Sequence, residues 1–396
     1  MHFNGHNHFH LYHMLHSRMS KMYIFYAMLT LAKNMIGIFI PIYLYVSGFP
    51  LVSVILYSIG QSLIYLLFTP YTIKIINKIG FKYTILFSFP FYFAHIIFLR
   101  FIHLGDLFFH LAWIAIGIHM VIFWPCYHSE IASRGSLKHR GSQIGTLQIL
   151  ATLFASLSPF LGGFILEYYS YTMLACIAGI LIFIGILPLL VSRDIRLKKY
   201  NFELIDYFKF MKTGSFKKTR RAFSAEGLEM FLNIMIWPLV LYLFFLNENY
   251  FFLGVLFSVI SFVSVIIVYF LKNYIDRHNK EEVLTFVSRG LSLNWLMRGI
   301  LFLFGSILIY FVESIFKLLN AIYSISFMSI FYNNAKKEGY MDYIIMREIG
   351  VHGMKIIFAT LILVLFLLFG EVKWVFFLVI LIGVFAALGL SSLKED

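Results

Sequence analysis

The sequence predicts an all-α membrane protein with twelve transmembrane helices in two pseudo-symmetric six-helix halves. Hydrophobic residues make up 61% of the 396 positions and charged residues only 13%, which is less charged surface than a soluble chain of this length needs. Apolar segments of about 20 residues, the length that crosses a bilayer, follow one another along the chain. One long basic link near the middle separates six of these segments from six more. The expected partner of most of the surface is therefore the lipid bilayer.

The apolar segments define twelve expected spans, and the links between them are mostly too short to fold alone. The expected spans are 23–47, 51–73, 83–104, 107–132, 143–167, 171–191, 224–246, 250–271, 284–304, 306–332, 348–369 and 373–392. They divide the chain into five parts. These are a histidine-rich tail (1–22), an N-terminal half (23–191), a basic link (192–222), a C-terminal half (223–392) and a short tail (393–396).

Lysine and arginine fall almost entirely on one side of this arrangement. The N-terminal tail and the even-numbered links carry most of them, whereas the opposite side holds only Arg100 and Lys373. Because cytoplasmic links retain positive charge, we expect both termini and the 192–222 link in the cytoplasm, with the protein in a plasma membrane of the bacterial inner-membrane type. The formal charge of +13 then reflects topology, and no nucleic-acid partner is expected.

Histidines crowd the extreme N-terminus, at His2, His6, His8, His10, His13 and His16. Imidazole binds zinc, nickel and copper, so a metal-sensing tail is one interpretation. No cysteine or acidic residue joins the cluster, and we therefore favour a tail without a fixed metal site and expect no metal and no cofactor. The tail is not expected to be a signal peptide, because the histidines interrupt any apolar stretch. Cys126 and Cys176 lie inside spans and predict no disulfide framework.

The two halves repeat short sequence patterns in the same order. Residues 36–45 (IGIFIPIYLY) and 233–242 (NIMIWPLVLY) align on Pro41 and Pro238. The ends of spans 2 and 8 read IINKIG and YIDRHN, and spans 5 and 11 open with QIGTLQILATL and EIGVHGMKIIFATL. Two six-span repeats with a binding site between them are the architecture of parallel-repeat transporters.

The chain resembles the major facilitator superfamily from about residue 23 to 392. The motif that follows span 2 in that family is matched by Asn77, Lys78, Gly80 and Lys82, although Ile73 stands in its glycine position and Asn77 in its aspartate position. In the second half Asp276-Arg277 keeps the acid–base pair of the motif, with Lys272 in place of glycine. The resemblance implies a gating role for these residues, and anchoring at the headgroup boundary is the alternative.

A second motif of the family lies in span 5. Pro159, Gly162 and Gly163 follow its antiporter pattern, with Ser158 for the first glycine, whereas the R-G-x-G pattern of span 4 is missing. The proline and glycines permit a helix bend, and close helix packing is the alternative explanation.

Polar stripes on spans 1, 4, 7 and 10 are the candidate site. An ionisable side chain within a span normally faces the bundle interior or a wet cavity, and helical spacing places the residues of each stripe on one face. The candidates are Lys33 and Asn34; His119, Trp124, Tyr127 and His128; Glu229, Asn233 and Trp237; and Glu313, Lys317 and Asn320. In the family these four spans line the central cavity, so the resemblance implies a substrate and ion site there.

Some charged residues have simpler explanations. Glu313 and Lys317 stand in the favourable i, i+4 order for a neutralising pair. Glu226 and Glu130 fit solvated helix ends, and Arg289, Arg298 and Lys355 fit inter-helix or headgroup contacts.

Lys33 has no such explanation, because it lies at mid-depth on span 1 and needs a counter-charge. Since Glu313 is expected to pair with Lys317, we expect Lys33 to pair with Glu229 across the interface between the halves in at least one conformation.

Function follows from what the links and stripes can support. The outer links are too short for a membrane enzyme's catalytic loop, no phosphate-binding G-x-x-x-x-G-K-S/T occurs, and a scaffold would not need charged stripes. We expect a monomeric, non-enzymatic secondary transporter that exports an amphipathic, drug-like solute in exchange for protons. A proton-coupled importer of a sugar or organic anion and a non-transporting scaffold or receptor are the alternatives.

Overall fold

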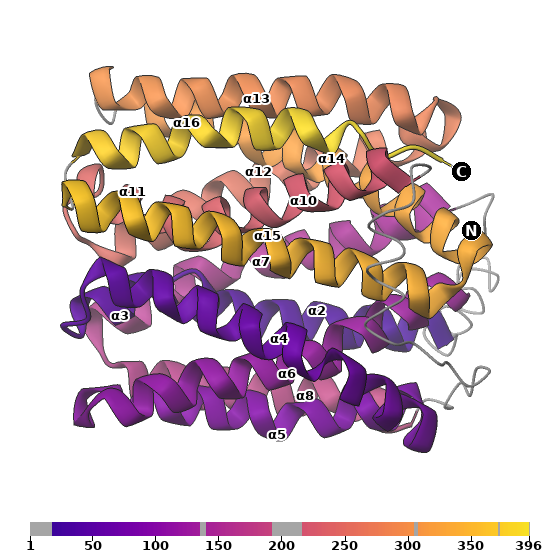
Figure 1. Cartoon of the computed structure of the whole chain (residues 1–396), viewed down its shortest axis with the longest axis horizontal. Coiled ribbons are helices and arrows are strands. Elements are labelled where there is room, and N and C mark those ends of the chain that lie inside the picture. Colours follow the sequence, from indigo (N-terminus) through magenta and orange to yellow (C-terminus); the bar gives the residue numbers. More distant parts are fainter. Residues whose placement is uncertain (1–17, 135–139, 192–215, 305–307, 371–372, 396) are drawn as a thin grey trace, which may run out of the picture.

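A computed structural model of the chain describes residues 18–134, 140–191, 216–304, 308–370 and 373–395 (Figure 1). The histidine-rich tail up to residue 17 and most of the 192–222 link lie outside the described residues. All regular structure in the described part is helical.

The N-terminal half is built from seven α-helices and one short 3₁₀ turn. They are α2 (Arg18–Gly37), α3 (Ile40–Val46), α4 (Leu51–Ile79), α5 (Phe81–Arg100), η1 (Ile102–Leu104), α6 (Asp106–Arg134), α7 (Arg140–Tyr168) and α8 (Tyr171–Leu190). The C-terminal half repeats this plan with α10 (Lys217–Phe231), the π-helical η3 (Leu232–Ile236), α11 (Trp237–Phe244), α12 (Tyr250–Arg277), α13 (Lys280–Phe304), α14 (Ile309–Glu338), α15 (Tyr340–Phe369) and α16 (Lys373–Leu390).

These helices follow the twelve expected spans in order. Among the described residues, nine segments are long and apolar enough to cross a membrane, and Thr152–Tyr168 and Tyr250–Ile266 are shorter apolar stretches. The main difference is at α15, which begins at Tyr340, although hydropathy places the start of the eleventh span at residue 348. The helix begins before the apolar stretch, because Ile344 and Ile345 in its first turns are buried. Arg347 therefore lies within a helix and not in a link.

Spans 1 and 7 are interrupted at equivalent prolines. The first span breaks between α2 and α3, where Pro41 occupies the first turn of α3. In the seventh, a π-helical segment precedes α11, where Pro238 again occupies the first turn. Proline lacks an amide hydrogen, and the first turn of a helix, where that donor has no partner within the helix, accommodates it. The two halves thus share an irregularity as well as a sequence pattern.

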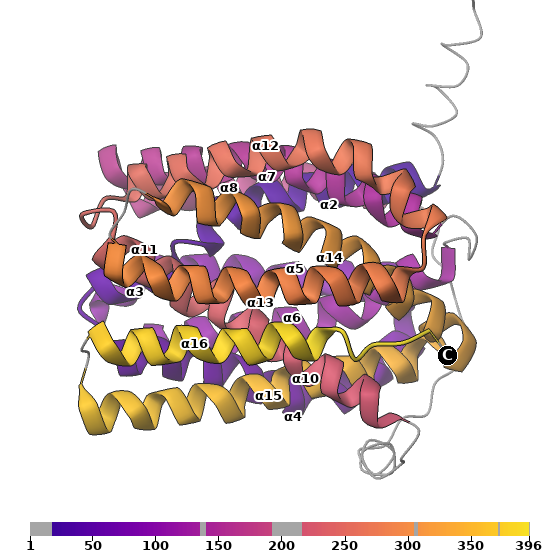
Figure 2. The same cartoon turned by 90° about the horizontal axis from the view of Figure 1, so that it is seen from above.

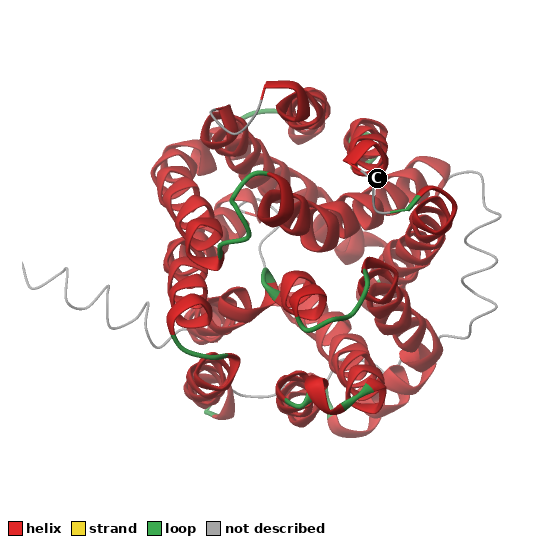
Figure 3. Ribbon diagram, turned by 90° about the vertical axis from the view of Figure 1, so that its left-hand side faces the viewer, coloured by secondary structure: helices red, strands yellow, loops and turns green. Residues whose placement is uncertain are grey.

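The helices run side by side along the long axis of the molecule (Figure 1), and the end-on view shows them packed into one bundle, several of them tilted (Figure 3). The first described residues of α2 and the end of α16 lie at the same end of the bundle (Figure 1). We call this end the termini side and the opposite end the far side.

The two halves meet along two seams at opposite edges of the bundle (Figure 2). One seam joins α7 to α12 and the other joins α4 to α15. In the α7–α12 seam a side chain at Gly163 would overlap the carbonyl of Tyr250, and one at Gly254 would overlap the carbonyl of Pro159. The Phe160 amide also donates a hydrogen bond of 2.8 Å to Ser258 Oγ.

The motif around Pro159 thus allows close packing between the halves, as small residues do in membrane helices. Gly162 has a similar role within the N-terminal half, where a side chain would overlap the carbonyl of Met35.

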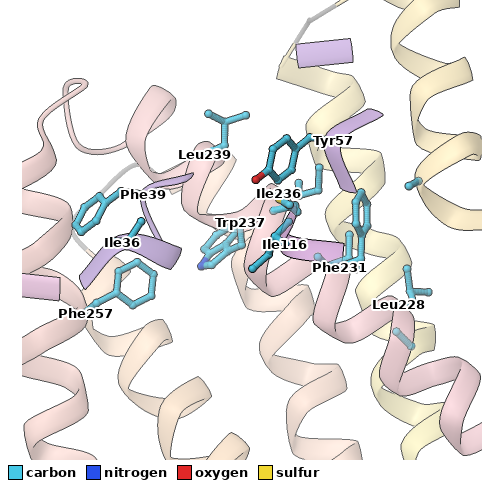
Figure 4. Close-up of a cluster of buried hydrophobic side chains, with 14 of the residues drawn as sticks. Ile36, Phe39, Tyr57, Ile116, Leu228, Phe231, Ile236, Trp237, Leu239 and Phe257 are labelled. Carbon is cyan, nitrogen blue, oxygen red and sulfur yellow. The ribbon is translucent and has the colours of Figure 1, made fainter. Parts of the chain in front are cut away.

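An apolar cluster fills the space between the halves toward the far side (Figure 4). The N-terminal half contributes Ile36 and Phe39, and the C-terminal half contributes Ile236, Trp237 and Phe257. Ile36 and Phe39 follow Lys33 along the first span, so this cluster covers the far side of the residues described next.

Candidate functional site

A central cavity of about 310 Å³ lies between the two halves, near the middle of the bundle's length. Five helices line it: α2, α6 and α7 from the N-terminal half, and α12 and α14 from the C-terminal half. Its lining residues are Tyr26, Leu29, Thr30, Lys33, Asn34, Trp124, Thr152, Ala155, Ser261, Ser264, Lys317, Asn320 and Ala321. Of the predicted site, Lys33, Asn34, Trp124, Lys317 and Asn320 are therefore brought together here.

Lys33 is held by a histidine and aromatic rings. Its Nζ lies 3.1 Å from His119 Nε2 and 4.4 Å from the centre of the Phe123 ring. His119 is fully buried, and its Nδ1 lies 3.0 Å from the carbonyl oxygen of Ser88. Since that carbonyl can only accept, the Nδ1–H form of His119 leaves Nε2 free to accept from the Lys33 ammonium. Among the described residues no carboxylate forms an ion pair with Lys33.

The C-terminal half buries a different cation, Arg298, in a complete set of partners. The guanidinium donates from Nε and Nη2 to the two carboxylate oxygens of Glu313, at 2.9 and 3.0 Å, and from Nη1 to Asn233 Oδ1 at 2.8 Å. Its face lies 3.8 to 4.5 Å from the centres of the Phe316, Trp295 and Trp237 rings. Bidentate pairing of this kind satisfies both charges of a buried pair.

Glu229 belongs to the same network. Its carboxylate accepts from Trp295 Nε1 at 2.9 Å and from Asn233 Nδ2 at 3.0 Å. Glu229, Asn233, Trp237 and Glu313 therefore surround Arg298 inside the C-terminal half, and none of them lines the central cavity.

Two expected pairings are replaced in this conformation. Lys33 contacts His119 and not Glu229, because Glu229 is already bonded to Trp295 and Asn233. Glu313 pairs with Arg298 and not with its helical neighbour Lys317. Arg298 does make the inter-helix contact expected of it, but at the centre of the C-terminal half.

A second cavity of about 220 Å³, the termini-side cavity, adjoins the central one and shares Tyr26 and Trp124 with it. It includes the predicted Tyr127 and His128. The polar residues around it are His128, Glu226, Ser324, Tyr332, Arg347, Glu348, His352 and Lys355. Half of them come from α15, which contributed no predicted site residue.

Arg347 organises this cavity. It donates to Glu226 from Nε at 2.9 Å and from Nη2 at 2.5 Å, and Nη1 contacts both Glu348 and His128 Nε2. His128 Nδ1 lies 2.7 Å from the Tyr332 hydroxyl. Because an arginine N–H only donates, this geometry fits a His128 that accepts at Nε2 and donates from Nδ1 to Tyr332.

Several of these bonds cross between the halves. Tyr65 on α4 donates to Glu348 on α15 at 2.9 Å, and Ser62 lies 3.1 Å from His352 Nδ1. His128 on α6 contacts both α14 and α15. We call Arg347, Glu226, Glu348, His128 and Tyr65 the termini-side cluster.

The sequence analysis misjudged much of this cluster. Glu226 is buried and paired with Arg347, so the expectation of a solvated helix end is wrong. The expected eleventh span, 348–369, begins one residue after Arg347 and so leaves it outside the candidate site. The signal that could have revealed the site is the spacing of Glu348, His352 and Lys355, which places all three on one face of a helix.

The motif residues after span 2 lie at the end of α4 and the start of α5. Gly80 joins the two helices with a φ of 84°, a left-handed conformation that favours glycine. Lys82 donates to the carbonyl of Leu190 at 2.6 Å and so caps the C-terminus of α8. Asn77 and Lys78 occupy the last turn of α4, and Lys78 is exposed. The side chains of Asp276 and Arg277 lie outside the described residues.

No group of three potential metal ligands occurs among the described residues, and the N-terminal histidines are not part of them.

The two six-helix halves around a mid-depth cavity define a class of multi-pass membrane transporters, and comparisons with known proteins identify the family. The sequence model of the Major Facilitator Superfamily matches residues 22–342, so the chain belongs to that superfamily. No curated protein matches the sequence. The superfamily resemblance drawn from the degenerate motifs is confirmed, as is the predicted fold.

Solved structures of transporters share this fold at low sequence identity. The nucleoside transporter NupG is 13% identical with a TM-score of 0.67, over 95% of this chain and 98% of its own. FucP, a fucose:proton symporter from E. coli solved in an outward conformation, is 12% identical with a TM-score of 0.66, over 94% and 96%. The human organic anion transporter MFSD10 is 13% identical with a TM-score of 0.64, over 93% and 99%.

Proposed function

We propose that this chain is a proton-coupled secondary transporter that binds its solute in the central cavity and works by alternating access. The observation that carries the proposal is the position of that cavity. It is polar, lies at mid-depth, is lined by both halves, and is covered toward the far side by the apolar cluster of Ile36, Phe39 and Trp237. Toward the termini side it adjoins the termini-side cavity and its charged cluster.

The two coverings differ in kind, which supports separate opening of the two ends. The far-side covering depends on apolar packing and on the tight α7–α12 seam. The termini-side covering depends on a few hydrogen bonds between the halves, such as Tyr65 to Glu348 and His128 to Tyr332. Water can replace such bonds at modest net cost, so small changes in charge can shift the balance between closed and open forms.

Proton coupling is proposed through Glu348 and His128. The Glu348 carboxylate accepts from Tyr65 in one half and from Arg347 in the other. A proton on this carboxylate would weaken both bonds and would leave the Arg347 charge less compensated. Protonation would thus loosen the contact between the halves at the termini side. Glu313 and Glu229 are less suited to this role, because both are enclosed in the Arg298 network.

The orientation follows from the charge distribution. We propose that the termini side faces the cytoplasm, as the positive-inside rule predicts. As a separate proposal, transport is outward. Residues outside the membrane can be labelled from either side to test this orientation.

The experiment uses purified protein in liposomes that contain a pH-sensitive dye. Gluconate, glucose and ethidium represent an organic anion, a sugar and an amphipathic drug-like cation. A coupled transporter moves protons when one of these solutes is added, and an imposed pH gradient drives its uptake or release. Glu348→Gln should abolish the gradient-driven flux and keep solute exchange without a gradient, whereas the exposed Glu338→Gln should change neither. Flux that ignores the pH gradient but follows sodium would contradict the coupling.

A further inference from the structure

We infer that the central cavity binds a small hydroxylated organic anion, whose acidic group lies between Lys33 and Lys317. The inference rests on the proposed transport function for its claim that the central cavity is the substrate site, and it adds the chemical class of the solute.

The charges that line the central cavity are of one sign. Lys33 comes from α2 in the N-terminal half, and Lys317 comes from α14 in the C-terminal half. No aspartate or glutamate is among the lining residues in the described part of the chain. A ligand in this space therefore meets two ammonium groups and no carboxylate.

The nearby carboxylates are committed to other partners. Glu313, one helical turn from Lys317, gives both of its oxygens to Arg298. Glu229 is bonded to Trp295 and Asn233. None of the ion pairs between described residues involves Lys33 or Lys317, and within the same residues the one hydrogen-bond partner of Lys33 is the imidazole of His119.

Aromatic rings take the place of acids around both lysines. The Phe123 ring lies 4.4 Å from Lys33 Nζ, and the Phe257 ring lies 5.7 Å from Lys317 Nζ. Such contacts offset only part of the cost of placing a cation inside a membrane protein. A bound anion would supply the missing counter-charge for both lysines at once. It would also connect the two halves, because each half contributes one lysine.

The other lining residues and the cavity volume indicate the functional groups and the size of the anion. Amide and hydroxyl groups of Asn34, Asn320, Ser261 and Ser264 line the cavity beside the lysines, and none of these four side chains makes a hydrogen bond across the cavity to another described residue. They suit a ligand with several hydroxyl groups. The volume of about 310 Å³ is near the lower end of the range for small-molecule sites, which favours an acid the size of a sugar acid over a larger drug-like compound.

The test is the thermal unfolding of the purified full-length protein in detergent with gluconate, glucose or inorganic phosphate. Gluconate and glucose are of similar size and differ in charge. A ligand that binds only the folded state raises the unfolding temperature, and for a chain of this size a saturating ligand should raise it by about 2 °C or more. Gluconate should give this shift, and glucose should not.

Variants connect the shift to the two lysines. Lys33→Gln and Lys317→Gln should each remove the gluconate shift. Both should fold, because each removes a half-buried charge that forms no ion pair with a described residue. Lys217→Gln, at an exposed lysine at the start of α10, removes the same charge elsewhere and should keep the shift.

Three results would overturn the inference. These are an equal shift with glucose and gluconate, a gluconate shift that survives in the double variant, and no shift with millimolar gluconate, tartrate or glucose 6-phosphate. If phosphate raised the unfolding temperature as much as gluconate does, the ligand would not need an organic part. The site would then be one for simple anions.

Counterflow of labelled gluconate in liposomes separates this inference from the proposed function. Binding that depends on both lysines but produces no counterflow would refute transport and keep the anion site. Counterflow of glucose that gluconate does not inhibit would support transport and refute the anion site.

Discussion

The two halves each bury a cation, and they treat it in opposite ways. Arg298 in the C-terminal half has no exposed surface and is paired with both oxygens of Glu313 and with Asn233. Lys33 in the N-terminal half faces a cavity, has an imidazole as its only hydrogen-bond partner and contacts no acid among the described residues. The first cation is satisfied by the protein itself. The second has no acidic partner among the described residues, and we therefore propose that Arg298 serves stability and Lys33 serves function.

The halves repeat in sequence and in the position of their prolines, so this difference is not imposed by the fold. It arises from single residues. Span 9 contributes Arg298 and span 10 contributes Glu313, and together they form a closed pair within one half. The N-terminal half has no acidic residue in contact with Lys33 and offers His119.

Loss of Arg298 should have the largest effect. Arg298→Met leaves Glu313 buried without its partner, and breaking a buried pair from one side typically costs about 3–5 kcal/mol. The unfolding temperature and the yield of monodisperse protein should both fall sharply. A double variant, Arg298→Met with Glu313→Leu, should recover much of the loss, since Glu313 no longer leaves an uncompensated charge. A single variant as stable as the native protein would contradict a structural role.

Lys33→Met should change stability little or increase it slightly, because it removes a buried charge that the protein does not compensate. The measurement is the unfolding temperature without any solute, with Arg298→Met beside it. Opposite changes in the unfolding temperature would show that the protein compensates the charge of Arg298 and not that of Lys33. If Lys33→Met is as destabilising as Arg298→Met, Lys33 must also have a partner that compensates its charge, and the contrast between the two cations is wrong.

A double-mutant cycle tests whether Lys33 and Glu229 interact. The sequence predicts that they pair in some conformation, and the structure bonds Glu229 to Trp295 and Asn233. If the described conformation dominates, the effects of Lys33→Met and Glu229→Gln on unfolding should add to within about 0.5 kcal/mol. A larger coupling would mean that the two side chains meet in another populated state, as the sequence-based hypothesis holds.

The smallest effect is expected at the surface pair of Glu281 and Lys394. Its distance of 2.9 Å equals that of Arg298 to Glu313, but its side chains are 28% and 39% exposed. Exposed pairs typically contribute about 0–1 kcal/mol and are screened by salt. Glu281→Gln should therefore shift the unfolding temperature by very little, and high salt should remove the shift. An effect as large as that of Arg298→Met would show that burial is not what separates the two pairs.

The sequence predicted the fold well because each span is a local pattern. Hydropathy gave the order of the spans, and the alignment of Pro41 with Pro238 marked the two interrupted ones. The polar stripes were a partial guide to the central cavity. Among the described residues, spans 1, 4 and 10 line it and contribute Lys33, Trp124 and Lys317, whereas span 7 does not, and spans 5 and 8 take part instead.

Pairing between helices could not be predicted in the same way. The partner of Glu313 depends on how span 9 packs against span 10, and a helical repeat shows only the neighbour Lys317. Arg347 and Glu348 were missed for another reason. The apolar stretch of span 11 begins after them, but the helix begins at Tyr340 and carries them into the bundle.

Distance measurements between spin labels on the two halves test alternating access most directly. Lys78→Cys with Lys337→Cys reports on the termini side, and Leu104→Cys with Phe369→Cys reports on the far side; all four positions are exposed. The background replaces the native Cys126 and Cys176 by serine. Acidification should lengthen one of these distances and shorten the other, because a rocking motion opens one end as it closes the other. A single, unchanged distance at both ends, with and without acid or gluconate, would contradict the account.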